Sequence, residues 1–287
     1  MITLRQVVDG LERLYPLDTA QSWDQVGLVS GDPDQPIRLV HFAVDPTQAV
    51  IEDAVAAGAD LLVTHHPLLL RGVHSVAATT AKGGAIRALI GGDLALYVAH
   101  TNADVAAGGV NDALAAALGL TEVEPLTIEE GQPLGRVGLL PTPVSLADFA
   151  TGLGEVLPAA AGGIRVSGDP EATVCRVAVS GGAGDSLFAA ARAAAADVFV
   201  TADLRHHPVL EDRETSRGGR PFIIDGGHWA TESLWLARAA AELADAVAAA
   251  TPEAARLETH ICTLRTDPWT FTVGAEALGG PSLKVDR

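Results

Sequence analysis

An internal repeat is the feature that most constrains the fold of this chain. A shift of 137 residues places Asp60-Leu61-Leu62-Val63-Thr64 on Asp197-Val198-Phe199-Val200-Thr201 without a gap. His65-His66-Pro67 then matches His206-His207-Pro208 after a four-residue difference in loop length. Self-similarity of this kind indicates two similar structural units in one chain. The alternative is convergence, in which two buried strands that end in polar residues have acquired similar compositions.

Short apolar runs alternate with alanine-rich stretches, which is the pattern of a sheet covered by helices. The expected strands are 37–44, 60–64, 94–100, 136–140, 173–180, 197–201, 221–225 and 259–264. The expected helices are 4–15, 47–57, 82–90, 110–118, 145–156, 185–195 and 228–250. We therefore predict an α/β protein of two similar lobes with mixed sheets flanked by helices. The first lobe is expected over 1–122, and the bridge and second lobe over 123–287, whose last part from about 223 could pack back on the first.

The charge balance limits the classes of partner. Lys and Arg number 19 against 36 Asp and Glu, giving a net charge of −17 over 287 residues. A surface of this sign repels phosphate backbones and anionic lipid, so we expect no nucleic-acid and no membrane partner. The two cysteines, Cys175 and Cys262, cannot staple a domain of this size. Together with the lack of an apolar leader, they favour a cytoplasmic protein.

Two adjacent histidines, His65 and His66, follow the expected strand 60–64 directly. Ligands bind at the carboxyl edge of open α/β sheets, so this is a favourable position for a site. Neighbouring side chains on an extended backbone point to opposite faces, so the pair suits one ligand to each of two ions. Alternatively, one of the two is a hydrogen-bonded core residue.

The expected strand 94–100 also runs into polar residues, among them Asp104. The carboxylate of Asp104 is a hard oxygen ligand that could bridge two cations, although an aspartate here is also a common turn or cap residue. His100, four residues earlier, could be a ligand or could orient that carboxylate.

A third strand ends at Asp225, and after two glycines a helix is expected to begin near His228. His228 and Glu232 are four residues apart and so lie on one face of that helix. This spacing brings an imidazole and a carboxylate to one point, as metal-binding helices require. An ordinary polar helix pair has the same spacing.

Considered together, these three strand ends deliver imidazoles and carboxylates to the same expected sheet edge. Five side chains exceed what one tetrahedral zinc ion needs, and they suit two divalent ions about 3.5 to 4 Å apart. The mixture of nitrogen and oxygen ligands fits Zn, Fe, Mn or Co and does not choose among them. The expected metal ligands are His65, His66, Asp104, His228 and Glu232.

Five motifs resemble the NGG1-interacting-factor-3-like family, whose members are often labelled GTP cyclohydrolase I type 2 homologs. In chain order they are Ser22-Trp23-Asp24-Gln25-Val26-Gly27-Leu28, Thr64-His65-His66-Pro67-Leu68, His100-Thr101-Asn102-Ala103-Asp104, Gly108-Gly109-Val110-Asn111-Asp112 and Gly227-His228-Trp229-Ala230-Thr231-Glu232. The resemblance implies a dinuclear metal centre in the cleft between two α/β domains and assembly as a homohexameric ring. The metal ligands of the family carry over onto the same five residues.

The chain departs from the family pattern at two positions. Thr201-Ala202-Asp203 stands where many relatives have Thr-Gly-Glu, and Trp229 stands where tyrosine is usual. Asp203 keeps an acid that is one carbon shorter, and Trp229 lacks the phenolic donor. The sequence therefore leaves open which groups support the metal ligands and which substrate is bound.

Three further histidines are the expected catalytic residues: His100, His206 and His207. Imidazole titrates near neutral pH, so they suit proton transfer or substrate contacts in the cleft. A purely structural role is the alternative for the pair at 206 and 207. The glycine-rich segment 180–184 follows a strand and could hold a phosphate on its amides. It lacks the P-loop and dinucleotide-binding patterns, so a plain turn is the other interpretation.

Two functions fit these residues. The first is a metal-dependent hydrolase, in which water bridging two ions attacks a nucleotide or another small phosphorylated or cyclic-amide substrate. The second is a non-catalytic metal-binding, metal-delivery or regulatory protein. The expected partners are a small-molecule substrate of unknown identity and further copies of the chain.

Overall fold

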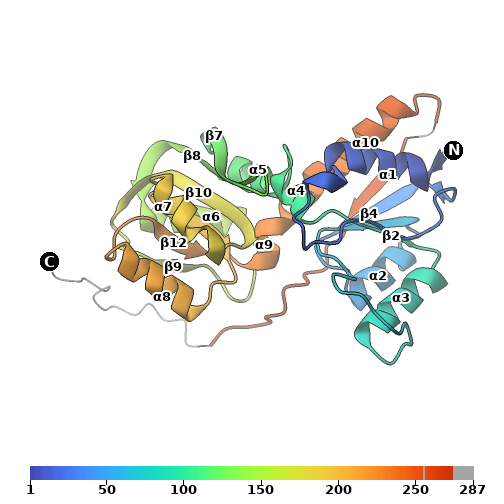
Figure 1. The fold of residues 1–287 in the computed structure, drawn as a ribbon, viewed down its shortest axis with the longest axis horizontal. Coiled ribbons are helices and arrows are strands. Elements are labelled where there is room, and N and C mark those ends of the chain that lie inside the picture. The colour runs from blue at the N-terminus through green and yellow to red at the C-terminus, as the bar shows by residue number, and fades with distance from the viewer. Residues whose placement is uncertain (255, 274–287) are drawn as a thin grey trace. The chain divides into compact units, whose positions relative to one another are not determined.

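The computed structural model describes residues 1–254 and 256–273 and divides the chain into two units, each built of a sheet and helices (Figure 1). Unit 1 comprises Met1–Gly109 and Trp235–Thr266. Unit 2 comprises Val110–Leu234 and Asp267–Arg287. Residues 274–287, which the expected second lobe 123–287 includes, lie outside the described residues.

Unit 1 is organised around a five-stranded mixed sheet with strand order β13-β4-β5-β6-β2. The first four strands are parallel, and β2 pairs antiparallel with β6. Figure 1 shows α1 and α10 on one face of this sheet and α2 and α3 on the other. The elements are β1 (Ile2–Thr3), α1 (Leu4–Leu14), η1 (Leu17–Thr19), β2 (Gly27–Ser30), β3 (Pro36–Ile37), β4 (Leu39–Ala43), α2 (Gln48–Ala56), β5 (Leu61–Thr64), α3 (Ala81–Gly91), β6 (Ala95–Val98), α4 (Thr101–Val105), α10 (Trp235–Ala250) and β13 (Glu258–Ile261).

Unit 2 contains a six-stranded mixed sheet with strand order β7-β8-β10-β11-β12-β9. β10, β11 and β12 are parallel, and the remaining pairs are antiparallel. The elements are α5 (Val110–Ala117), β7 (Thr121–Glu129), β8 (Gln132–Ser145), α6 (Leu146–Val156), β9 (Arg165–Ser167), β10 (Thr173–Ala183), η2 (Asp185–Leu187), α7 (Phe188–Ala193), β11 (Val198–Ala202), α8 (His206–Thr215), β12 (Phe222–Asp225) and α9 (His228–Ser233). The predicted fold class, mixed sheets flanked by helices, is confirmed in both units.

The inner parallel strands of both units are largely apolar, as expected for strands that helices cover on both faces of a sheet. β5 and β11 are buried at every residue. In unit 1, Ile51 of α2 and Leu89 of α3 pack against Leu62 and Leu96 of the sheet. In unit 2, clusters of buried side chains again contain residues from both the helices and the sheet.

The sequence repeat corresponds to a repeated structural feature at the start of β5 and β11. Oδ2 of Asp60 accepts hydrogen bonds from the amides of Arg38 and Leu39 at 2.7 and 2.9 Å. Oδ2 of Asp197 accepts from the amides of residues 175 and 176, both at 2.8 Å. The equivalent carboxylate therefore holds the neighbouring strand in each unit, at the start of β4 in unit 1 and at residues 175 and 176 of β10 in unit 2.

The short elements β1, β2, β3, β9 and α4 were not predicted, and three longer segments also differ from the sequence prediction. Segment 121–145 forms a long β7-β8 hairpin, whereas only a strand over 136–140 was expected. Helix α8 contains His206 and His207, a segment for which no helix was predicted. The helix expected over 228–250 is divided into α9 and α10. The hydroxyl groups of Thr231 and Ser233 donate hydrogen bonds to backbone carbonyls of the preceding turn, an arrangement that bends helices.

Within residues 1–254 and 256–273, no helix is both long enough and apolar enough to cross a bilayer.

Candidate metal centre

His65 and His66 lie just beyond the end of β5 in unit 1. Nδ1 of His65 is 2.9 Å from the carbonyl oxygen of Ala99, and Nδ1 of His66 is 2.7 Å from Oδ1 of Asp45. Because each Nδ1 has this partner, Nε2 is the atom that each ring presents to a metal. The two ring centroids are only 5.1 Å apart, so the expectation that the rings point to opposite faces was wrong. The alternation of a strand does not apply to them, because β5 ends at Thr64.

His100 and Asp104 join the same group through the turn that follows β6. His100 precedes the first residue of α4, and Asp104 lies within that helix. The ligand atoms of His65, His66 and His100 all lie within 4.8 Å of one another. Oδ1 of Asp104 is 3.7 Å from Nε2 of His65. Unit 1 thus gathers four of the predicted site residues: His65, His66, His100 and Asp104.

Asp24 is a buried carboxylate that the sequence analysis did not select. Its Oδ1 is 3.0 Å from Nδ1 of His100, and its Oδ2 accepts from the amide and the hydroxyl of Thr101 at 3.0 and 2.6 Å. Burial alone would raise the pKa of Asp24, but these hydrogen bonds outweigh it and hold the pKa well below its usual range. Asp24 therefore acts as an ionised support that fixes the ring of His100.

His228 and Glu232 form the second group, which lies in unit 2. Gly227, with φ 86°, leads from β12 into α9, which begins at His228. Nε2 of His228 is 2.9 Å from Oε1 of Glu232, and its Nδ1 is 2.9 Å from Oδ2 of Asp203. Burial alone would lower the pKa of His228, but hydrogen bonds to these two carboxylates raise it to about 11. The imidazole is held by a carboxylate on each side.

The glycine-rich segment 180–184 lies against this second group. A Cβ at Gly182 would lie 2.3 Å from Oε1 of Glu232 and 3.0 Å from Nε2 of His228, so a side chain there would clash. The amide of Gly182 donates to the hydroxyl of Thr231, and the amide of Gly181 donates to Oδ1 of Asn111. These two amides have protein partners, so the glycines are explained by close packing rather than by phosphate binding.

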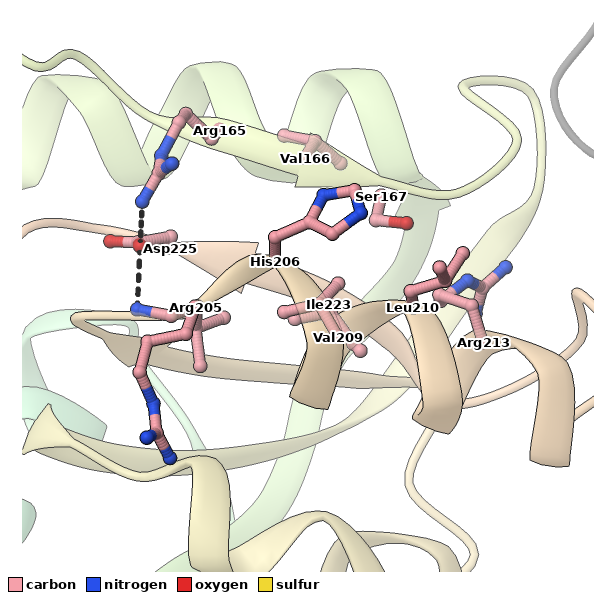
Figure 2. A pocket seen from close by; sticks show the side chains of 11 residues that line it. Arg165, Val166, Ser167, Arg205, His206, Val209, Leu210, Arg213, Ile223 and Asp225 are labelled. Atoms are coloured by element: carbon pink, nitrogen blue, oxygen red, sulfur yellow. Dashed lines mark hydrogen bonds and ion pairs between the residues drawn. The ribbon is translucent and has the colours of Figure 1, made fainter.

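His206 and His207 begin helix α8, and their rings are 5.1 Å apart. His206 lines a pocket of about 340 Å³ between α8, β9 and the end of β12. Figure 2 shows its imidazole pointing from α8 into this pocket, toward the strand that carries Ser167. Neither His228 nor Glu232 lines the pocket. A catalytic role for His206 and His207 stays a prediction.

Two further carboxylates orient imidazoles, and both follow buried strands. Asp45 lies two residues after β4 and holds His66, and Asp203 lies one residue after β11 and holds His228. The rule that selected the histidines, a polar residue at the carboxyl end of a parallel strand, also applies to these two positions.

The sequence comparisons agree on one family. The model of the family described as Duf34/NIF3 (NGG1p interacting factor 3) matches residues 2–268. A protein of Streptomyces coelicolor named GTP cyclohydrolase 1 type 2 homolog is 49% identical, covering 98% of this chain and all of its own. A protein of Mycobacterium tuberculosis with the same name is 35% identical, covering 94% of this chain and 97% of its own.

The solved structures agree with this result at the level of the fold. A Bacillus cereus protein related to NIF3 superposes with a TM-score of 0.86 at 24% identity, covering 95% of this chain and 99% of its own. The sheet arrangement that positions both groups of residues is therefore shared with that protein. Because the family model spans nearly the whole chain and a relative is 49% identical over its full length, the chain belongs to the Duf34/NIF3 family.

Proposed function

We propose that this chain is a metal-dependent hydrolase whose two divalent ions are held by His65, His66, Asp104, His228 and Glu232. The chain belongs to the Duf34/NIF3 family, and its structure contains groups of residues that could bind metal. The hydrolase activity and the number of ions are the part to be tested.

One observation carries the proposal: all three predicted imidazole ligands are held through Nδ1. The partners are the carbonyl of Ala99 for His65, Asp45 for His66 and Asp203 for His228. Metal-binding histidines are generally oriented by such a partner on the second ring nitrogen, which leaves Nε2 for the metal. A chance collection of polar histidines would not share this arrangement.

A predicted carboxylate ligand also lies beside Nε2 of one imidazole in each unit. Asp104 is 3.7 Å from Nε2 of His65, and Glu232 is 2.9 Å from Nε2 of His228. An ion coordinated by Nε2 would therefore find an oxygen ligand close by. The nitrogen and oxygen donor set fits Zn, Fe, Mn or Co. When bound, two such ions would supply electrostatic stabilisation and an activated water.

His100 is the residue of this chain best placed to move a proton. Its Nδ1 is fixed by Asp24, and its ring centroid is 5.1 Å from that of His65 and 5.5 Å from that of His66. An imidazole oriented by a buried carboxylate is a common arrangement for a general acid or base. We propose that Nε2 of His100 accepts the proton of the attacking water or delivers one to the leaving group.

The substrate class that we propose is a nucleotide or another small phosphorylated or cyclic-amide molecule. The support is the name of the relatives, GTP cyclohydrolase 1 type 2 homolog, together with the chemistry that paired divalent ions perform on such substrates. A net charge of −17 would repel an anionic substrate, so the bound cations would have to attract it locally.

The decisive experiment combines metal analysis with turnover. Wild-type protein loaded in turn with Zn, Fe, Mn or Co is assayed against nucleotides, phosphoesters and cyclic amides, beside His65→Ala, Glu232→Ala and the double variant. His74→Ala is the matched control, because His74 is an exposed histidine that belongs to neither group. We expect turnover by wild type and the control, and none by the three variants.

The double variant also tests whether the five residues serve one centre. If they do, each single variant already disrupts the shared centre, and the double variant loses little more metal than either single one. Independent sites would instead give additive losses. Turnover that persists in the double variant would refute the proposal. Metal retention by wild type without turnover of any substrate would also refute it, and would favour a metal-delivery role.

A further inference from the structure

A second group of metal-binding side chains lies within unit 1 and shares no residue with the centre proposed above. It consists of His41 on β4, Asp53 on α2 and Cys262, which follows β13. The ligand atoms of these three side chains all lie within 4.8 Å of one another. A nitrogen, an oxygen and a sulfur ligand therefore converge on one point.

His41 is the residue that most clearly requires a ligand. Its side chain is completely buried, and neither ring nitrogen has a hydrogen-bond partner among residues 1–254 and 256–273. Nε2 lies 3.4 Å from Oδ2 of Asp53, a distance that suits two atoms sharing an ion. Buried polar atoms without a hydrogen bond are destabilising and rare, so this one needs an explanation. A cation coordinated by the imidazole would supply one.

The pairing of β13 with β4 brings two more side chains to His41. His260 is its partner in the parallel register, and the ring centroids are 4.9 Å apart. The amide of Cys262 donates to the carbonyl of Phe42 at 2.8 Å, so the pairing continues past the end of β13. Residues two apart on a strand share a face, which places His260 and Cys262 on the same side of the sheet.

Asp53 completes the group from the helix that covers this face. Its Oδ2 is 3.8 Å from Sγ of Cys262, and 43% of its side chain is exposed. An ion could therefore enter from solvent and meet Asp53 first. Cys262 is buried and forms no disulfide, so its sulfur is available in the reduced protein.

We propose that His41, Asp53 and Cys262, with His260 as the fourth ligand, form a Zn²⁺ site. Two imidazoles, a thiolate and a carboxylate are ligands that tetrahedral zinc accepts, and the thiolate selects against Mg²⁺ and Ca²⁺. Cys262 would bind as the thiolate and release its proton to solvent. Because the ligands come from β4, α2 and β13, bound zinc would fasten the C-terminal strand of unit 1 to the rest of its sheet.

Sulfur gives this site a signature that the centre in the proposed function lacks, since none of His65, His66, Asp104, His228 and Glu232 is a cysteine. Metal-free full-length protein is titrated with Co²⁺, and the thiolate-to-cobalt charge-transfer absorption is recorded. We expect this absorption in wild type, in Cys175→Ser, and in the His65→Ala/Glu232→Ala double variant. We expect none in Cys262→Ser. The cobalt absorption therefore tests this site alone, and its absence would say nothing against the hydrolase proposed above, which is tested by turnover.

A second measurement does not depend on a buried substitution. Asp53→Asn changes a partly exposed helix residue, and we expect it to weaken Zn²⁺ binding at this site at least about tenfold. Loss of a residue that only orients a ligand already lowers metal affinity about 10- to 100-fold, and Asp53 is proposed as a ligand itself. Elemental analysis should also show one zinc fewer per chain in Cys262→Ser than in Cys175→Ser. No sulfur-to-cobalt absorption in wild type, its persistence in Cys262→Ser, or unchanged zinc affinity in Asp53→Asn would each overturn the proposal.

Discussion

The two units share the start of one strand and differ at its end. Asp60 and Asp197 each accept two amide hydrogen bonds from the neighbouring strand. After β5 the chain continues directly into His65 and His66, whereas β11 extends to residue 202 and is followed by Asp203. The strand start is thus used in the same way in both units, while the carboxyl end, where ligands bind in such sheets, has diverged.

The difference is sharpest at a single position of the repeat. Counted without a gap, His66 corresponds to Asp203. In unit 1 this position holds a predicted metal ligand, which Asp45 orients. In unit 2 it holds a carboxylate that orients His228. The same strand end therefore presents a predicted metal ligand in one unit and a carboxylate that orients a predicted ligand in the other.

The largest expected effect tests whether the two His-His pairs differ in function. His66→Ala removes a predicted ligand and should lower metal affinity at least about 100-fold. Loss of a residue that only orients a ligand lowers it less, by about 10- to 100-fold. His207→Ala is the matched change in unit 2 and should leave metal affinity unchanged, because the ring of His207 contacts that of His206 edge-on at the start of α8. Metal titration of both variants followed by elemental analysis would decide. Equal losses in the two variants would mean that the pairs are equivalent after all.

The next effect concerns the carboxylates that orient the imidazoles. Asp45→Asn and Asp203→Asn keep the shape of the side chain but weaken the hold on His66 and His228, and each should reduce metal affinity about 10- to 100-fold. Asp34→Asn is the control, because Asp34 is an exposed partner of a surface ion pair. The same titration measures all three variants. A loss confined to one of the two sites would show that only one unit contributes to metal binding.

Much of this arrangement was predictable from local patterns in the sequence. All eight expected strands and the amphipathic or alanine-rich helices appear, because apolar runs and turn residues report burial directly. The β7-β8 hairpin was harder to predict, since β7 has only one buried residue and contains Pro125. Its strand character comes from pairing with β8 and not from its own pattern.

Prediction of the site had a similar limit. The ligand residues follow from strand ends and helix spacing, but the roles of Asp24, Asp45 and Asp203 in orienting imidazoles are visible only through their hydrogen bonds. Asp24 precedes its partner His100 by 76 residues, so no local spacing connects them. His41 and Cys262 are likewise brought together only by the pairing of β4 with β13.

A smaller effect tests the shared strand start. Asp60→Ala and Asp197→Ala each leave two backbone amides without their charged acceptor, and each should cost about 1.5 kcal/mol of unfolding free energy. Hydrogen exchange followed by mass spectrometry should show faster exchange near residues 38–39 in the first variant and 175–176 in the second. Exchange that rises equally in both units, whichever aspartate is replaced, would contradict the assignment of these carboxylates to separate sheets.

The smallest expected effect compares a buried orienting carboxylate with an exposed one. The Asp24 side chain is 0% exposed, whereas the Asp203 side chain is 61% exposed, so only Asp24→Asn should alter stability measurably, by about 1 kcal/mol at neutral pH. Because the pKa of Asp24 is lowered on folding, its contribution is fully present above the unfolded-state pKa of about 3.9 and is lost as the pH falls toward the folded-state value. Denaturant unfolding of wild type and both variants between pH 7 and pH 3 gives the free energy of unfolding at each pH.

The wild-type advantage over Asp24→Asn should therefore shrink on acidification, while Asp203→Asn should follow wild type throughout. If the difference in unfolding free energy between wild type and Asp24→Asn stayed constant with pH, Asp24 would contribute through its shape and not through its charge. In that case the ring of His100 would lack an ionised support, and its role as the proton carrier in unit 1 would lose its physical basis. The same experiment therefore tests stability and the proposed chemistry together, because both depend on one hydrogen-bonded carboxylate.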